Sequence, residues 1–437
     1  MATTTFVYLH KLRGFYDQLV PLRRVNFLVG ENSTGKTSFM QLLSMFTNPA
    51  FWVFEPSFDA TDLAKRHFLD LVSASIVNKL EKSTFTIGTI SIADDGPATA
   101  DHGMFVTYVN EDGRPEPTRV TVVSEGKART VDGRIWDQNE GDTYAYRVRE
   151  VGSLWAQLPS ASRASRYAAA HRTASSRTMP TKTVSAEQAH MPFFVRFGEV
   201  LRDGKSFGEG IAVPKLFRRH MVTLAPIRTK PRRTYDEPQT EFSGEGDHTP
   251  YLIKRQLSNK TKAEAFSAFM RKVGTATGLF TDVIVKNYGR AARAPFEVQV
   301  QLGKTPLSLE QVGYGVPQAL PLIVEMFSRP QDSAFLIQQP EVHLHPKAQA
   351  AIGDLVAELS RADKKAFVIE THSDFAIDRF RMNVRENGPI SSQLLFFQRI
   401  KGTNKAIPIP IAEDGSLPED QPAAYRDFFL NESLALL

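Results

Sequence analysis

A glycine-rich loop between an apolar run and an amphipathic segment constrains this chain more than any other feature. Gly30-Glu31-Asn32-Ser33-Thr34-Gly35-Lys36-Thr37 follows the pattern Gly-x-x-x-x-Gly-Lys-Thr, and residues 25–29 before it form a short apolar run typical of a buried strand. A helix is expected to begin near Lys36, because apolar side chains follow at helical spacing: Leu42, Leu43, Met45 and Phe46. The order strand, loop, helix predicts a parallel α/β sheet.

A loop of this pattern can surround phosphate oxygens with backbone N–H groups, because its glycines permit a close approach. We therefore expect the loop to bind ATP, and Lys36 to contact the β- and γ-phosphates. Thr37 is the expected hydroxyl ligand of Mg²⁺, ahead of Ser38. The full set of expected ATP-contacting residues in the loop is Gly30, Glu31, Asn32, Ser33, Thr34, Gly35, Lys36, Thr37 and Ser38.

Composition narrows the class without naming an activity. The 437 residues are 42% hydrophobic and 23% charged, as in an ordinary globular protein, and the net charge of +5 is too small to identify a nucleic-acid binder by itself. The absence of cysteine excludes disulfides, thiolate metal sites and a cysteine nucleophile. With neither a signal-like start nor an apolar run of roughly 18 residues, we expect a cytoplasmic chain that makes no membrane contact.

Patterning predicts three regions. Residues 1–150 are expected to hold the phosphate loop and an antiparallel β-subdomain, with turns at 110–113 and 132–133. Residues 151–300 are expected to form a helical or irregular insertion, in which 160–190 is rich in Ser, Ala and Thr and contains a basic stretch. Residues 301–437 should complete the parallel sheet with helix 316–327, strand 334–337, helix 347–359 and strand 367–369. No long coiled coil is expected.

Two further strand ends carry polar residues that suit the same chemistry. Residues 334–341 form a short apolar strand followed by Gln338, Gln339 and Glu341, and residues 367–374 form a second strand followed by Thr371-His372-Ser373-Asp374. Ligands bind at the carboxyl ends of such parallel strands. Gly313 and Gly315 open another predicted helix, whose start could hold a phosphate or could be an ordinary core helix.

This order of motifs resembles the ABC-type ATPases of the OLD, RecF and SMC-related group. The resemblance implies that Gly313 and Gly315 belong to a signature that closes on ATP bound by another subunit, so the chain would be a homo-oligomer. It implies that His372 is the switch histidine near the γ-phosphate, and that His343 and His345 lie in a loop facing the second subunit. Pro317 departs from the serine that relatives often have.

The larger departure lies in the acidic pair that the family uses for Mg²⁺ and water. Gln338 and Gln339 occupy these two positions, and a glutamine adds no negative charge and is no effective base. We expect slow hydrolysis, with Gln338 as a weak metal ligand and Gln339 orienting water. Glu341, the nearest carboxylate, either replaces the missing acids or holds the turn that follows.

The residues after His372 contain no Asp-x-Asp cluster like that of a TOPRIM nuclease, the domain that OLD proteins carry, so we expect an ATPase without a built-in effector. Stand-alone ATPases of this kind resemble the sensor subunits of two-gene anti-phage systems such as PARIS or Septu. That resemblance implies a separate nuclease or toxin effector and a phage-encoded trigger.

Two other classes stay open. In a RecF-like repair ATPase, DNA would lie along the basic stretch Arg163, Arg166, Arg172, Arg177 and Lys182 and along Arg228, Lys230, Arg232 and Arg233, although the first stretch can also be a solvated loop. A scaffold that binds ATP without turnover is the other class.

Overall fold

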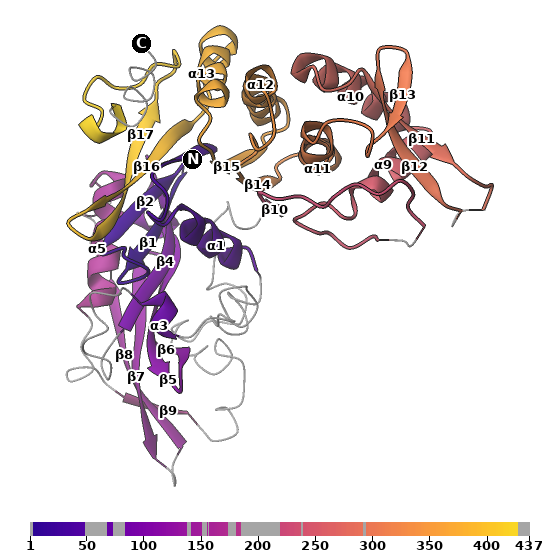
Figure 1. Ribbon diagram of the computed structural model, residues 1–437. Coiled ribbons are helices and arrows are strands. Elements are labelled where there is room, and N and C mark those ends of the chain that lie inside the picture. Colours follow the sequence, from indigo (N-terminus) through magenta and orange to yellow (C-terminus); the bar gives the residue numbers. More distant parts are fainter. Residues whose placement is uncertain are drawn as a thin grey trace. The chain divides into compact units, whose positions relative to one another are not determined.

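The computed structural model describes residues 3–48, 68–72, 84–137, 141–150, 155, 157–173, 181–184, 219–236, 239–291 and 294–426 (Figure 1). The chain divides into two compact units, each discontinuous in sequence. Unit 1 comprises Met1–Arg23, Glu31–Arg219 and Phe396–Pro408, and unit 2 comprises Arg24–Gly30, His220–Leu395 and Ile409–Leu437. Among the described residues, no helix is both long enough and apolar enough to cross a bilayer.

Unit 1 is built on an eight-stranded sheet in the order β2-β1-β4-β5-β6-β7-β8-β9, and neighbouring strands run antiparallel. The strands are β1 (Thr3–His10), β2 (Gln18–Leu22), β4 (Thr84–Ala93), β5 (His102–Glu111), β6 (Arg114–Ser124), β7 (Lys127–Asp137), β8 (Gly141–Glu150) and β9 (Thr181–Val184). The helices are α1 (Lys36–Phe46), α3 (Phe68–Leu71) and α5 (Ser160–Arg172), with the short 3₁₀ turn η2 (Ala98–Ala100). The predicted antiparallel β-subdomain is thus present.

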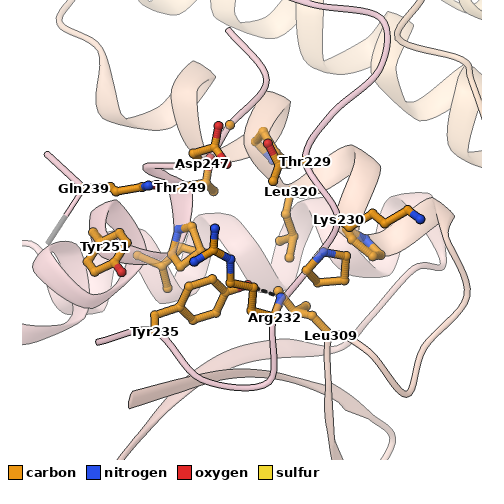
Figure 2. Close-up of a pocket in the computed structure, with 16 residues that line it drawn as sticks. Thr229, Lys230, Arg232, Tyr235, Gln239, Asp247, Thr249, Tyr251, Leu309 and Leu320 are labelled. Atoms are coloured by element: carbon orange, nitrogen blue, oxygen red, sulfur yellow. Dashed lines mark hydrogen bonds between the residues drawn. The ribbon is translucent and has the colours of Figure 1, made fainter. Parts of the chain in front are cut away.

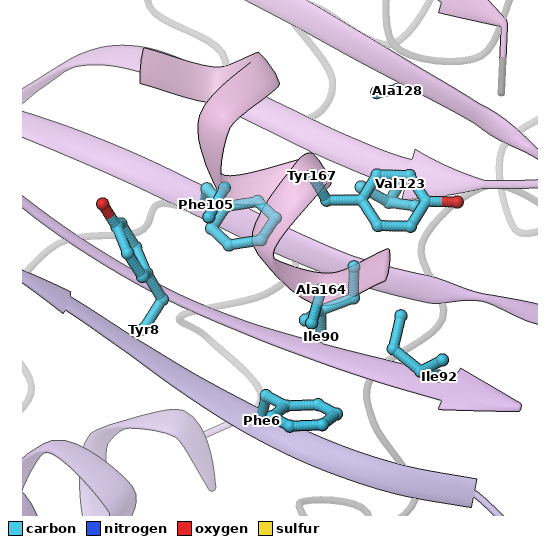
Figure 3. Close-up of a cluster of buried hydrophobic side chains, with 10 residues drawn as sticks. Phe6, Tyr8, Ile90, Ile92, Phe105, Val123, Ala128, Ala164 and Tyr167 are labelled. Atoms are coloured by element: carbon cyan, nitrogen blue, oxygen red, sulfur yellow. The ribbon is translucent and has the colours of Figure 1, made fainter. Parts of the chain in front are cut away.

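Helix α5 packs on this sheet and completes a hydrophobic core (Figure 3). Its buried residues Ala164, Tyr167 and Ala168 meet a cluster of strand residues: Phe6, Tyr8, Ile90, Ile92, Phe105, Val123 and Ala128. Apolar side chains three and four positions apart give the helix this buried face. The solvated loop considered for the basic stretch that begins at Arg163 is therefore wrong for residues 160–172, which form a helix with a buried face.

Arg163 is buried on the inner side of α5 and does not belong to an exposed basic surface. Its guanidinium lies 3.1 Å from the Asp101 carboxylate, and the two side chains are only 1% and 0% exposed. Tyr167 also donates to Asp101, at 3.3 Å. Burial raises the pKa of Asp101 to about 6, although its hydrogen bonds and Arg163 oppose that rise.

The imidazole of His171 joins the threonines of neighbouring strands into one buried polar chain. Thr107 Oγ1 lies 2.8 Å from Nε2, and Thr121 Oγ1 lies 2.8 Å from Nδ1. Thr86 extends the chain beyond Thr107, and Thr130 extends it beyond Thr121, each at 2.7 Å. Both ring nitrogens are therefore satisfied, as burial requires.

The predicted turn at 110–113 is present, with positive φ angles of 49° at Asp112 and 84° at Gly113. The one predicted at 132–133 is wrong. Strand β7 runs through it, and the register with β8 shifts between Asp132 and Ile135, which indicates a β-bulge. A bulge and a turn share the same Asp-Gly signal, because both need unusual backbone angles.

A six-stranded sheet in the order β10-β14-β15-β3-β16-β17 carries the predicted α/β elements. Four strands that belong to unit 2 run parallel: β10 (Met221–Leu224), β14 (Ala334–Gln338), β15 (Ala366–Glu370) and β3 (Val25–Gly30). The sheet continues with β16 (Ser392–Ile400) and β17 (Thr403–Ile411). The core strands are nearly all apolar and buried, as expected of parallel strands covered on both faces.

Unit 2 also contains the helices α9 (Thr249–Ser258), α10 (Ala263–Thr277), α11 (Gly315–Ser328), α12 (Pro346–Ala362) and α13 (Asp374–Asn387). A three-stranded antiparallel sheet follows the order β11 (Asp282–Asn287), β12 (Phe296–Leu302) and β13 (Thr305–Ser308). The expected α/β class is confirmed. The longest described helix has 17 residues, so the described part of the chain holds no long coiled coil.

Candidate functional site

The phosphate loop takes a conformation that glycine makes possible. Gly30 and Gly35 have φ angles of 128° and 101°, in the region that other residues rarely adopt. A Cβ on Gly35 would lie 2.5 Å from the Phe15 ring. Helix α1 begins at the next residue, Lys36, as the sequence predicted. The loop thus has the backbone shape and the helix start that phosphate binding uses.

Within the loop, the lysine side chain is buried and held by the backbone. Lys36 is 3% exposed, and its Nζ donates to the Glu31 carbonyl at 2.8 Å. Thr34 Oγ1 donates to the same carbonyl at 2.8 Å. Thr37 is exposed, whereas Ser38 Oγ accepts a hydrogen bond from Arg13 Nη1 at 2.9 Å. The hydroxyl of Ser38 is thus engaged by Arg13 within unit 1.

In unit 2, the parallel register brings the polar residues that follow β14 and β15 to the carboxyl ends of neighbouring strands. Ile337 pairs with Ile369, and Glu370 pairs with Leu28 two residues before Gly30, so three strands end together. Gln338 ends β14. Gln339 follows with a φ of 42°, and its N–H donates to the Glu370 carbonyl at 2.8 Å. The two glutamines therefore stand at the edge where the sequence predicted them.

Glu341 uses both carboxylate oxygens to hold the loop after β15. Thr371 Oγ1 donates to Oε2 at 2.8 Å, and the His372 N–H donates to Oε1 at 2.7 Å. The His372 side chain is exposed. The structure thus brings together Glu341 and His372, which are 31 residues apart in sequence.

The loop then passes into α13 through a capped helix start. The Ser373 hydroxyl accepts from the Ala376 N–H at 3.2 Å and donates to Gln349 Oε1 at 2.6 Å. Burial, followed by the Asp378 charge, raises the pKa of Asp374 to about 6. These contacts leave His372 as the exposed residue between a buried threonine and a capping serine.

The start of α11 lies against the loop that follows Glu341. A Cβ on Gly315 would lie 2.8 Å from the His343 carbonyl, and the rings of Tyr314 and His343 are 5.8 Å apart. Gly313 is exposed, with open space around its Cα. His345 has a structural function, because its Nδ1 caps α12 by accepting from the Ala348 N–H at 3.3 Å.

Arg228, which the sequence placed on a possible DNA path, lies instead against α11. It is 2% exposed, and three hydrogen bonds join it to Gln318 in the first turn of α11. Its Nη1 donates to the Gln318 carbonyl at 2.9 Å, while Nε and Nη2 find no partner among the described residues. Burial lowers the pKa of Arg228 to about 10, and the nearby Glu341 charge opposes that decrease.

The proposed DNA path is therefore wrong at two of its arginines, because Arg163 and Arg228 are both buried. The other predicted DNA-contacting residues differ in exposure. Arg166, Lys230, Arg232 and Arg233 are exposed, whereas Arg172 is half-buried and pairs with Asp17. Arg177 and the side chain of Lys182 lie outside the part of the chain that the structure describes.

A pocket lies beside residues 229–232, between this segment, α9 and α11 (Figure 2). It is open to solvent, and Tyr235, Tyr251 and Arg232 line it. The Arg232 N–H donates to the Tyr235 hydroxyl at 3.0 Å. The buried hydroxyls of Thr229 and Thr249 on its wall find no partner within the described part of the chain.

Residues 226–378 match a family model described as "AAA domain, putative AbiEii toxin, Type IV TA system". The match contains Arg228, α11, Glu341 and His372, and excludes the phosphate loop. Among curated proteins, no sequence matches the chain.

Three solved SMC heads are similar to the chain over 94% of its length. An SmcHead bound to the C-winged helix domain of ScpA has 11% identity, a TM-score of 0.42 and 98% coverage of that chain. The SMC head domain from Thermotoga maritima has 12% identity, a TM-score of 0.37 and 99% coverage. The Smc head with an extended coiled coil bound to the C-terminal domain of ScpA, from Pyrococcus furiosus, has 11% identity, a TM-score of 0.40 and 97% coverage.

Proposed function

We propose that this protein is a slow ATPase that binds ATP through the phosphate loop. The observation that carries the proposal is the loop itself, in which Gly30 and Gly35 adopt positive φ angles and α1 begins at Lys36. Lys36 then contacts the β- and γ-phosphates, in exchange for its present bond to the Glu31 carbonyl. The match of residues 226–378 to an AAA domain supports this assignment.

Slow turnover follows from the neutral pair at the end of β14. Thr37 and Gln338 are the proposed ligands of Mg²⁺, a donor set of hydroxyl and amide oxygens that fits the ion but adds no negative charge. Mg²⁺ held by these residues would neutralise charge that develops on the phosphates. Gln339 orients the attacking water by hydrogen bonding and cannot act as an effective base.

In this proposal, Glu341 and His372 act as one unit. Both oxygens of Glu341 accept hydrogen bonds from the loop after β15, so the carboxylate fixes the backbone that carries His372. The exposed imidazole of His372 contacts the γ-phosphate. Glu341 thus replaces the missing acids by positioning the loop that carries His372. It is also the carboxylate closest in sequence to the two glutamines.

We further propose that the ATP site is shared between subunits of a homo-oligomer. Gly315 opens α11, Gly313 lies two residues before it and is exposed, and Tyr314 between them is 58% exposed. An exposed helix start of this kind suits a phosphate on a second subunit. A strictly monomeric protein with and without ATP, measured by light scattering, would contradict the shared site.

For the biological role, we propose a sensor in an anti-phage system that holds a separate nuclease or toxin effector until a phage component releases it. The resemblance to stand-alone defence ATPases motivates this role, and the toxin–antitoxin wording of the matched family description is compatible with it. Co-purification with the product of an adjacent gene tests it. A RecF-like DNA-binding role requires DNA affinity that falls steeply with salt, although the burial of Arg163 and Arg228 disfavours it.

The central experiment measures ATP binding and phosphate release for the wild type, for Lys36→Ala and for the control Lys304→Ala. Lys304 is exposed in unit 2, so its replacement removes the same charge without touching the loop. We expect Lys36→Ala to lose ATP binding and the control to match the wild type. If Lys36→Ala keeps its ATP affinity, the assignment of the phosphate loop is wrong. If the wild type binds ATP without turnover, only the scaffold class is left.

A further inference from the structure

Arg228 carries a buried charge that has no role in the proposed function. A guanidinium that is 2% exposed, with Nε and Nη2 unpartnered among the described residues, is costly because burial removes its hydration. Exchanging it for an apolar residue of similar volume would remove that cost. A buried charge of this kind therefore suggests a functional requirement at this position.

The sheet register places Arg228 and Glu341 at the same edge. Leu224 of β10 pairs in parallel with Ile337 of β14, and each of the two charged residues comes four positions after its paired residue. Neighbouring parallel strands end on the same side of a sheet, so both segments leave at that side. The Glu341 charge opposes the decrease that burial causes in the pKa of Arg228.

On its other side, Arg228 is fastened to the first turn of α11. Its N–H donates to Gln318 Oε1 at 3.1 Å, and Gln318 Nε2 donates back to the Arg228 carbonyl at 3.1 Å. Its Nη1 donates to the Gln318 carbonyl at 2.9 Å. Backbone and side chain are thus both tied to the helix that Gly315 opens.

We propose that Arg228 is a positioning residue, which joins the first turn of α11 to Glu341 and through Glu341 to His372. The proposal rests on the proposed ATPase function and adds a mechanism to it. When α11 engages the nucleotide of another subunit, a shift of its first turn moves Arg228, and with it the charge that holds Glu341. Because Glu341 binds Thr371 and the His372 N–H, the shift reaches the residue that contacts the γ-phosphate.

Arg228 and Glu341 supply charges that the neutral pair Gln338 and Gln339 lacks. With no carboxylate at these two positions, Glu341 is the carboxylate nearest to them in the sequence. In this proposal the charge of Arg228 adds to the hydrogen bonds from Thr371 and His372 in placing it. Arg228 should therefore affect turnover through Glu341 and hardly affect the binding of ATP.

A double-mutant cycle tests this, with Arg228→Met, Glu341→Gln, the double variant, and Arg233→Met as a control on the same segment. Arg233 is exposed, so its loss should leave turnover unchanged. Arg228→Met should lower turnover about tenfold and change the Kd for ATP less than about twofold. In the Glu341→Gln background, Arg228→Met should cost less than about a further twofold. Full multiplication of the two single effects would overturn the proposal.

Two further measurements keep the test decisive. Arg228→Lys retains the charge and should recover part of the turnover, which a purely structural role for the guanidinium would not predict. Hydrogen exchange at the His372 amide should speed up in Arg228→Met, because its acceptor Glu341 is less well held. This measurement needs no hydrolysis, so an inactive wild type refutes the ATPase proposal alone, whereas unchanged exchange refutes the role of Arg228.

Discussion

The main-chain N–H of His372 donates to Glu341 Oε1 at 2.7 Å, so the segment after β14 fixes the segment after β15. The second oxygen of Glu341 accepts from Thr371 Oγ1, a hydroxyl that in turn accepts from the Ser373 N–H at 3.0 Å. One carboxylate thus sets the backbone on both sides of His372. Hydrogen bonds to a charged group are stronger than neutral ones, contributing about 1.5–3 kcal/mol each.

Thr371→Val tests this network with a side chain of nearly the same shape. The valine cannot donate to Glu341 or accept from Ser373, so we expect the loop to loosen and turnover to fall by about tenfold. Phosphate-release assays with saturating ATP provide the measurement. Thr305→Val, at an exposed position of β13, is the control and should behave as the wild type. Equal turnover in Thr371→Val would contradict a role for this hydroxyl.

Gln338→Asp tests whether the neutral pair Gln338 and Gln339 weakens the binding of Mg²⁺. The new carboxylate adds a negative charge at the end of β14, so we expect a lower Mg²⁺ concentration for half-maximal turnover, by about tenfold. Gln299→Asp supplies the control, since Gln299 lies in the separate sheet of β11, β12 and β13. The assay titrates Mg²⁺ at fixed ATP. If the half-maximal concentration stays the same, Gln338 is not a metal ligand.

The local features of the site could be predicted from the sequence because they depend on neighbouring residues. The phosphate loop, the start of α1 at Lys36 and the strands β14 and β15 follow from glycine spacing and apolar runs. The helix start at Gly315, the first residue of α11, could also be predicted from its local sequence. Each of these signals is complete within about fifteen residues.

Contacts between distant segments could not be predicted in this way. Arg228 and Gln318 are 90 residues apart, and Arg163 pairs with Asp101 across 62 residues. In sequence both arginines belong to basic stretches, whose usual solvated position suggested a DNA surface. Their burial depends on which strand and helix face each other, information that periodicity does not contain.

The buried pair of Arg163 and Asp101 should be costly to break and less costly to remove entirely. Arg163→Met leaves the Asp101 charge buried without its partner, and we expect unit 1 to lose about 3–5 kcal/mol. Adding Asp101→Asn should recover part of that loss, because no charge then stays buried. Thermal unfolding of Arg163→Met, of Asp101→Asn alone and of the double variant provides the comparison. Losses that simply add would show that the two charges do not interact.

The buried imidazole of His171 should make the stability of unit 1 depend on pH. Burial lowers its pKa to about 3, from an ordinary value near 6.5, because a charged ring would lose its hydration among Thr107, Thr121 and the Phe105 ring. Between these two values the unfolded chain binds a proton that the folded unit does not. Stability is therefore fully present above about pH 6.5 and is lost as the pH falls, by up to about 1.4 kcal/mol per pH unit.

Asp101 works in the opposite direction, because its raised pKa of about 6 means that the folded unit binds the extra proton at pH 4–6. A wild-type curve alone would mix these two effects, so the measurement compares thermal unfolding of the wild type and of His171→Gln from pH 7.5 to 4.5. Glutamine can still bond both threonine hydroxyls but does not titrate. The variant should be less stable at pH 7.5, with the difference shrinking as the pH falls. A constant difference across this range would mean that His171 is not the neutral, buried group inferred from its contacts.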